Sequence, residues 1–213
     1  YNRNQCGSSS AVDSVQQIIC IDSIAHAAFI LDISIVCSTI PIQATNTSLS
    51  LNDCDPEFNW DVQYLPTTCG SGLGTWAFNN GSDTTSINAG FTFYDPGYYI
   101  ISLKAINRCD SAIFTDTVLI KSPPEAAIST IPDFCDTADI FPSASIDSCL
   151  GSISNYQWNF NGGTPNSSSS INPGMVSYTQ VGQYTVTLDV TNECATVSAS
   201  EVFNVNELPI ISM

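Results

Sequence analysis

The chain has 213 residues, of which 43% are hydrophobic, and its 20 acidic residues outnumber 4 basic ones, giving a formal net charge of −16. This much apolar surface can form packed cores, which excludes a disordered chain. The negative charge repels nucleic-acid phosphates and anionic membranes, so neither is an expected partner. No apolar run approaches the roughly 20 residues of a membrane-spanning helix. Tyr1 opens no basic and apolar leader, so we expect an internal piece of a longer protein.

The cysteine pattern points to disulfides. The chain has nine cysteines, one histidine and no Cys-x-x-Cys pair, whereas zinc ligands usually come in close pairs. Such cysteine usage, with few lysines, indicates an extracellular, oxidising compartment outside the cytoplasm. The odd count leaves at least one thiol without a partner inside the chain.

The first segment reads as the end of an incomplete repeat. Asn4-Gln5-Cys6-Gly7-Ser8 matches Asn107-Arg108-Cys109-Asp110-Ser111. We therefore predict that residues 1–24 supply the terminal strand or strands of a preceding, truncated repeat.

Two complete repeats follow. The stretch from Trp76 to Cys109 shares its pattern with the stretch from Trp158 to Cys194, and both end in Asn-x-Cys. Apolar residues alternate with other residues in both, as in a β-strand with one face in a core. The matching apolar positions, 85 residues apart (184 minus 99), are Tyr99, Ile101, Leu103 and Ala105 against Tyr184, Val186, Leu188 and Val190.

These matches divide the chain into a first repeat over residues 25–121, a second over 122–207, and the start of a linker over 208–213, with Pro123 and Pro124 at the join. Cys37 lies 98 residues before Cys135 (135 minus 37), so the first repeat carries 13 extra residues (98 minus 85) after its Trp60 strand. The insertion contains Cys69, Gly70, Gly72 and Gly74. Without a strand-loop-helix context or a following lysine, a flexible hairpin is favoured over a phosphate loop.

Each repeat is expected to form about seven short strands separated by Asn, Gly, Pro and Ser, which is typical of an all-β immunoglobulin-like sandwich. Trp158 is the expected core aromatic, and Tyr184 the expected tyrosine corner. In the second repeat we predict strands near residues 126–130, 138–145, 154–161, 170–178, 184–191 and 196–205.

The motifs Tyr156-Gln157-Trp158-Asn159-Phe160-Asn161-Gly162-Gly163, Asn172-Pro173 and Val181-Gly182-Gln183-Tyr184-Thr185-Val186 carry a family resemblance. They resemble the PKD domain, in tandem in this chain. The Asn-x-Cys variant further resembles large gliding-motility and cell-surface adhesins exported by the type IX secretion system. The resemblance implies PKD-type sandwiches in a surface protein associated with the outer membrane through its other parts.

Few residues indicate chemistry. His26 is the only histidine, so a hydrolytic triad would depend on it, and a plain strand or linker residue is the favoured reading. Asp53, Asp55 and Glu57 place three carboxylates in one loop, which could bind Ca²⁺, although a solvated turn is favoured. We predict no catalytic residue and no required cofactor.

The sandwich fold predicts disulfides. In an immunoglobulin-like sandwich the loop before the Trp strand and the loop between the last two strands share one end. We therefore predict the pairs Cys54–Cys109 and Cys149–Cys194, with Cys37–Cys69 as a second-choice pair; Cys20 and Cys135 have no assignment.

Two functions compete. The first is a non-catalytic repeat segment of a large adhesin, acting as spacer and adhesive module in attachment or gliding, with neighbouring repeats of the same chain, and a surface glycan or protein, as partners. The second is an accessory domain pair of a secreted polysaccharide- or protein-degrading enzyme. The short, proline-stiffened join predicts sandwiches stacked end to end as a rod.

The resemblance also implies O-glycosylation, at Asp followed by Ser or Thr and then a small or aliphatic residue or Thr. Six tripeptides fit, although Asp-Ser and Asp-Thr are also ordinary turn pairs. The acceptor residues are Ser14, Ser23, Thr84, Ser111, Thr117 and Thr137.

Overall fold

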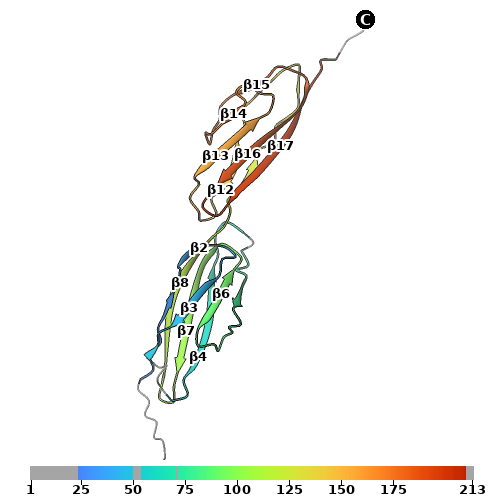
Figure 1. Ribbon diagram of the computed structural model, residues 1–213. Helices are drawn as coiled ribbons and strands as arrows, with labels where there is room; N and C mark the ends of the chain where they lie inside the picture. The colour runs from blue at the N-terminus through green and yellow to red at the C-terminus, as the bar shows by residue number, and fades with distance from the viewer. Residues whose placement is uncertain (1–23, 50–53, 71, 210–213) are drawn as a thin grey trace, which may run out of the picture.

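A computed structural model describes residues 24–49, 54–70 and 72–209. These residues form two β-sandwiches stacked end to end along one axis, as Figure 1 shows. The described part has no helix long and apolar enough to cross a bilayer. The prediction for residues 1–24 falls almost entirely outside the described residues.

The first sandwich packs two four-stranded sheets. One has the order β1-β3-β6-β5 and the other β2-β8-β7-β4, with β2 parallel to β8. Alternating burial along the strands turns one face of each sheet inward, as the sequence pattern predicts. The strands are β1 (Phe29–Leu31), β2 (Ile35–Cys37), β3 (Ile42–Asn46), β4 (Glu57–Leu65), β5 (Trp76–Asn79), β6 (Ala89–Phe93), β7 (Gly97–Ile106) and β8 (Ser111–Lys121).

The second sandwich has one large sheet, of order β10-β17-β16-β13-β14, facing two strand pairs, β9 with β12 and β11 with β15. As in the first sandwich, a short strand, β10, runs parallel to the last strand. The strands are β9 (Glu125–Ile128), β10 (Phe134–Cys135), β11 (Ala138–Ile140), β12 (Ala144–Asp147), β13 (Asn155–Phe160), β14 (Ser167–Ser168), β15 (Val176–Tyr178), β16 (Gly182–Thr191) and β17 (Thr196–Asn206).

Two predicted strands are interrupted. The strand expected over residues 138–145 divides into β11 and β12 around Pro142, which lies where the first sandwich has Ala44 within β3. Proline offers no N–H to a ladder, so the strand breaks there. The strand expected over 170–178 is reduced to β15, because Pro173 and Gly174, at φ +83°, form a turn before it.

Each sandwich has its own core. Trp60 in the first and Trp158 in the second are almost fully buried among aromatic and aliphatic side chains. The Tyr184 hydroxyl donates to the carbonyl of Gln180 at 2.8 Å, and that of Tyr99 to Asp95 at 2.9 Å. The predicted core tryptophan and tyrosine corner are therefore confirmed, and the first sandwich repeats both.

Candidate functional site at the junction of the sandwiches

A disulfide joins the two sandwiches at the end of β2. Cys37 is bonded to Cys194, with Cα atoms 5.6 Å apart and 157 residues between them in sequence. Cys37 lies beside Lys121 at the end of the first sandwich because β2 runs parallel to β8. Cys194 lies in the turn between β16 and β17. The bridge therefore connects the exit of one sandwich to a turn of the next.

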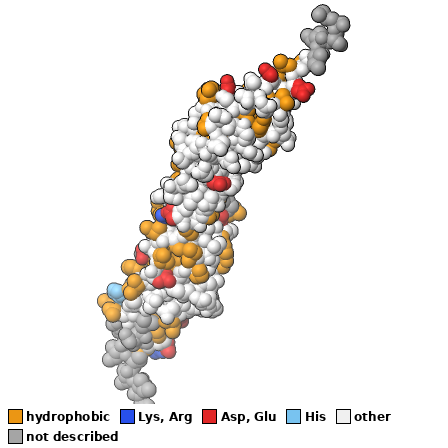
Figure 2. All heavy atoms as spheres, turned by 45° about the horizontal axis from the view of Figure 1, so that its top comes forward, with side chains coloured by type: hydrophobic (Ala, Val, Ile, Leu, Met, Phe, Trp, Pro, Cys, Tyr) orange, Lys and Arg blue, Asp and Glu red, His pale blue; other side chains and the backbone are white. Residues whose placement is uncertain are grey.

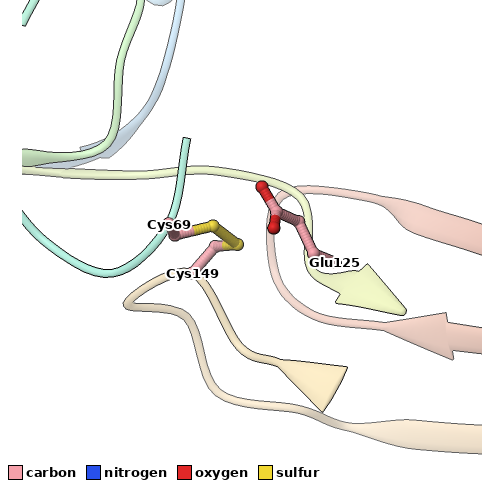
Figure 3. Close-up of side chains that lie close together, drawn as sticks. All are labelled: Cys69, Glu125 and Cys149. Carbon is pink, nitrogen blue, oxygen red and sulfur yellow. A yellow bond between two sulfur atoms is a disulfide. The ribbon is translucent and has the colours of Figure 1, made fainter. Parts of the chain in front are cut away.

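A second disulfide crosses the same junction. Cys69, in the insertion of the first sandwich, is bonded to Cys149, which precedes the Trp158 strand of the second. Both cysteines are buried, and Figure 3 shows the bridge between loops of the two sandwiches. The insertion is therefore a structural contact with the second sandwich. Its interpretation as a flexible hairpin excursion was wrong.

Asn192 organises the polar part of the junction. Its Nδ2 donates to the carbonyls of Ser122, in the linker, and Ser148, at 2.8 and 3.1 Å. Its Oδ1 accepts from the backbone N–H groups of Cys194 and Ala195 at 2.9 and 3.1 Å. The side chain is only 4% exposed. One buried amide thus shapes the turn that carries Cys194 and holds the linker against it.

An ion pair lies beside this amide. Lys121, one of only four basic residues, pairs with Glu193 of the second sandwich. The Glu193 carboxylate also accepts from the N–H of Ser152 at 2.7 Å. The hydrogen bond from Lys121, followed by that from Ser152, lowers the pKa of Glu193 to about 2. Glu193 is therefore ionised at neutral pH and fixed to the first sandwich.

Two further hydrogen bonds tie the insertion to the second sandwich. Thr68 Oγ1 donates to Asp147 Oδ2 at 2.9 Å, and the N–H of Gly70 donates to Glu125 Oε1 at 3.3 Å. Gly70 has φ +77°, and a Cβ there would lie 2.7 Å from Pro96, so the loop needs glycine. Together with the disulfides, these contacts resist rotation and bending between the sandwiches. The junction provides mechanical coupling.

The predicted disulfides were wrong. Cys149 and Cys194 each bond to a cysteine of the first sandwich, and Cys37 and Cys69 each bond to one of the second. Cys54 is in a disulfide, but not with Cys109. The prediction assumed that each sandwich is crosslinked internally. The stacking instead brings cysteines of different sandwiches together at the shared end.

Cys69, Cys149 and Glu125 lie close enough for a metal cluster (Figure 3). Because the two sulfur atoms form a disulfide, they do not offer thiolate ligands, and the group does not fit a metal site. The predicted carboxylate group is only partly described, since Asp53 lies outside the described residues. Asp55 pairs with Arg108 at the exposed surface, and Glu57 lies on β4. The carboxylate of Asp55 thus pairs with the guanidinium of Arg108.

The other predicted residues lie on the surface. His26 is exposed, just before β1. Of the predicted glycosylation acceptors, Ser14 and Ser23 lie outside the described residues; the others, Thr84, Ser111, Thr117 and Thr137, are all exposed. Acidic side chains are scattered over the face shown in Figure 2.

The fold and the junction define the chain as a tandem pair of immunoglobulin-like sandwiches in a disulfide-bonded, extracellular type of protein. Residues 140–205, within the second sandwich, match the model of the PKD domain. This match agrees with the family resemblance of the sequence over most of the second repeat.

Solved structures of immunoglobulin domains are similar to the chain. The N-terminal four Ig domains of Dscam1 isoform 6.9 share 15% identity over 82% of this chain and 43% of that one, with a TM-score of 0.38. The ectodomain of mouse nectin-like molecule 4 shares 12% over 89% and 67%, with a TM-score of 0.42. An I-band fragment of titin shares 13% over 87% and 67%, with a TM-score of 0.43. The chain thus spans less than half of the Dscam1 fragment.

Sequence reasoning missed Asn192 and Glu193 as junction residues. A signal for Asn192 was present, because Asn-x-Cys recurs at residues 107–109 and 192–194 and was treated only as a turn. A signal for Cys69 was present too, because the insertion that contains it occurs only in the first repeat and adds a cysteine that the second repeat lacks. Glu193 has no counterpart signal, since the first repeat has Arg108 at that position.

Proposed function

We propose that the chain is a non-catalytic spacer segment of a large secreted cell-surface protein, in which stacked sandwiches transmit force and hold other parts at a fixed distance. The observation that carries this proposal is the double disulfide across the junction, Cys37–Cys194 and Cys69–Cys149. Two disulfides at different points of the junction restrict the bending between domains that a single linker would allow. Such a junction suits an extended, stiff array.

The finer proposal is a repeat segment of a surface adhesin, exported by the type IX pathway and acting in attachment or gliding. Its support is the sequence resemblance, together with exposed Asp-Ser and Asp-Thr sites on which glycans would face solvent. Neighbouring repeats, and a glycan or protein at the target surface, are the partners of this proposal. The whole protein would be associated with the outer membrane through other parts.

A second candidate is an accessory pair in a secreted polysaccharide- or protein-degrading enzyme, because a stiff rod would also hold a catalytic domain away from a polymer. The repeat pattern favours the spacer array, since Asn4-Gln5-Cys6 is a third copy of the Asn-x-Cys motif.

Small-angle scattering of the oxidised protein tests the spacer proposal. The longest strands of both sandwiches have 11 residues and span about 36 Å at 3.3 Å per residue. We expect a rod-like profile with a maximum dimension of at least twice this length, unchanged by ionic strength. A compact profile, or one that broadens into a flexible ensemble while both bridges are intact, would contradict the proposal.

Glycosylation has its own test. Protein isolated from the native host should exceed the sequence mass by several equal glycan units, with Thr84 among the modified sites because it lies in an exposed loop. Replacing the matched aspartate, Asp83→Ala, should remove that unit only. An unmodified intact mass would contradict this part of the proposal.

A further inference from the structure

The two sandwiches present equivalent cysteines at equivalent ends. Cys37 ends β2, which is parallel to β8 with Cys37 opposite Lys121. Cys135 ends β10, which is parallel to β17 with Cys135 opposite Asn206. The next N–H in each case donates to the last-strand carbonyl, from Ser38 at 2.7 Å and from Asp136 at 2.8 Å. The backbone therefore places the two cysteines at equivalent positions of their sandwiches.

Only the first of these two cysteines forms a disulfide. Cys37 is bonded to Cys194 of the sandwich stacked above it. Cys135 lies exposed as a thiol at the far end of the second sandwich. The last rung of β16 and β17 joins Gly182 to Val205, so Val181 and Leu208 lie at this same end, 48% and 60% exposed. Figure 2 shows hydrophobic side chains exposed near this end, together with acidic ones.

The complementary element also recurs. Asn192 holds its turn by accepting from the N–H groups two and three residues on, and by donating its own N–H to Ala195 at 3.0 Å. Asn107 does the same, with bonds of 2.9 Å from Cys109 and Asp110 and one of 3.0 Å to Asp110. Each sandwich thus carries the Asn-x-Cys turn at one end and the strand-end cysteine at the other. Such a head-to-tail contact does not close on itself and extends into a filament of modules.

We propose that Cys135 is the attachment site for a further module of the same kind, which stacks on the far end of the second sandwich and forms a disulfide from its own Asn-x-Cys turn. The inference deepens the proposed spacer function and rests on it. The partner is recognised by three features of the known junction: a turn cysteine, an asparagine that holds the linker, and a short linker equivalent to residues 121–124.

Bond formation requires an oxidant, and a disulfide of the secretory compartment supplies it. The Cys135 thiolate attacks one sulfur of that disulfide and releases the other as a thiolate. The turn cysteine of the next module, having lost its proton, then attacks the Cys135 sulfur of this mixed disulfide and releases the attached sulfur of the oxidant as a second thiolate. The products are the Cys135 bridge and a reduced dithiol that has taken up two electrons and two protons.

A three-module chain tests the proposal. Residues 122–206 are repeated directly after Asn206, so that the new join has the spacing of the existing one. The added copy carries three changes. Thr196→Ser is a mass tag, and Cys135→Ser ensures that only the original Cys135 can be found alkylated. Cys149→Ser is included because the second sandwich has no insertion to supply a partner for that cysteine. After refolding in glutathione buffer, the protein is alkylated, digested with pepsin without reduction, and mapped by mass spectrometry.

We expect a peptide pair that joins Cys135 to the tagged Cys194 turn, at a yield similar to that of the Cys37–Cys194 pair in the same sample. The latter pair reports that the native junction has formed. Mostly alkylated Cys135 in a sample with a high yield of the Cys37–Cys194 pair would overturn the proposal, as would a bond from Cys135 to any other cysteine. In the control, the original Cys135 is also replaced by serine, and the tagged turn cysteine should then be open to alkylation.

Scattering by the unmodified protein separates the two proposals. A rigid two-sandwich rod together with an alkylated Cys135 in the three-module chain would contradict only the attachment site. A flexible or compact two-sandwich profile would contradict the spacer function itself.

Discussion

Cys37 and Cys194 are 157 residues apart, yet they bond the last turn of one sandwich to the end of the other. Together with Cys69–Cys149 this bond makes the linker a braced segment. Two sandwiches joined by a linker alone would have one covalent connection, whereas the described residues here provide three: the linker and the two disulfides. We therefore expect reduction of the two bridges to loosen the junction while both cores stay folded.

Tryptic cleavage after Lys121 reports on the bracing. Lys121 ends β8 at the join, whereas Lys104 lies inside β7 of the first sandwich. Replacing all four bridging cysteines by serine should loosen the join and speed cleavage after Lys121, by about tenfold for each 1.4 kcal/mol of local stability lost. Cleavage after Lys104 is the internal control and should stay slow. Equal acceleration at both sites would indicate global unfolding and contradict separate cores.

Asn192→Asp should weaken the junction. The substitution keeps the oxygen that accepts from the turn but replaces the Nδ2 donor by an oxygen facing the carbonyls of Ser122 and Ser148. The two carbonyls then lose their buried donor, and leaving a buried polar group unsatisfied costs about 1–3 kcal/mol. Thermal unfolding of the second sandwich should shift accordingly. Asn159→Asp, exposed on β13, adds the same charge and should have little effect.

Acid should weaken the Lys121–Glu193 contact. Since the pKa of Glu193 is lowered to about 2 in the folded protein, its contribution is fully present above the ordinary value near 4.5 and is lost as the pH falls from there towards 2. The melting temperature of the wild type should approach that of Glu193→Gln over this range. Because the pair is partly exposed, we expect a small difference that high salt reduces. A constant difference across this range would contradict the assignment.

The two tyrosine corners form a matched pair for mutation. Tyr99 is fully buried, whereas Tyr184 is only partly buried. Replacing either by phenylalanine removes one hydrogen bond to a backbone carbonyl, with a net cost of about 0.5–1.5 kcal/mol. We expect Tyr99→Phe to lie at the upper end, because the carbonyl of Asp95 then has less access to water. Denaturant unfolding followed separately for each core would measure both, and a larger loss for Tyr184→Phe would contradict the argument.

Alkaline titration distinguishes the buried tyrosines from the rest. Burial raises the pKa of Tyr99, and burial, followed by the nearby Tyr184, raises that of Tyr178 to about 12. The protonated forms are thus favoured by folding, and this stability is lost as the pH rises from about 10 through these values. Absorbance at the phenolate band should show a late fraction that ionises together with unfolding. In Tyr178→Phe the late fraction should decrease by one tyrosine equivalent, which would assign that part of it to Tyr178.

Local pattern was sufficient for much of the fold. Alternating apolar positions from Tyr184 to Val190 define β16, and the burial of Trp158 and the corner at Tyr184 follow from the same spacing. These features depend on contacts between residues close in sequence or on strands whose order the sandwich topology dictates. The break at Pro142 also has a local cause, because proline has no N–H to donate, but the strand predicted over residues 138–145 ran across it.

The disulfide pairing depended on the tertiary structure. A sequence shows which cysteines lie at the ends of strands, but it does not show which of them come close enough in space to pair. The choice between partners within one sandwich and partners across the join depends on how the two bodies are stacked, which is set by the linker, the insertion around Cys69 and the buried amide of Asn192. Distances across that junction arise from the relative orientation of two folded domains, and no periodicity in the chain encodes such an orientation.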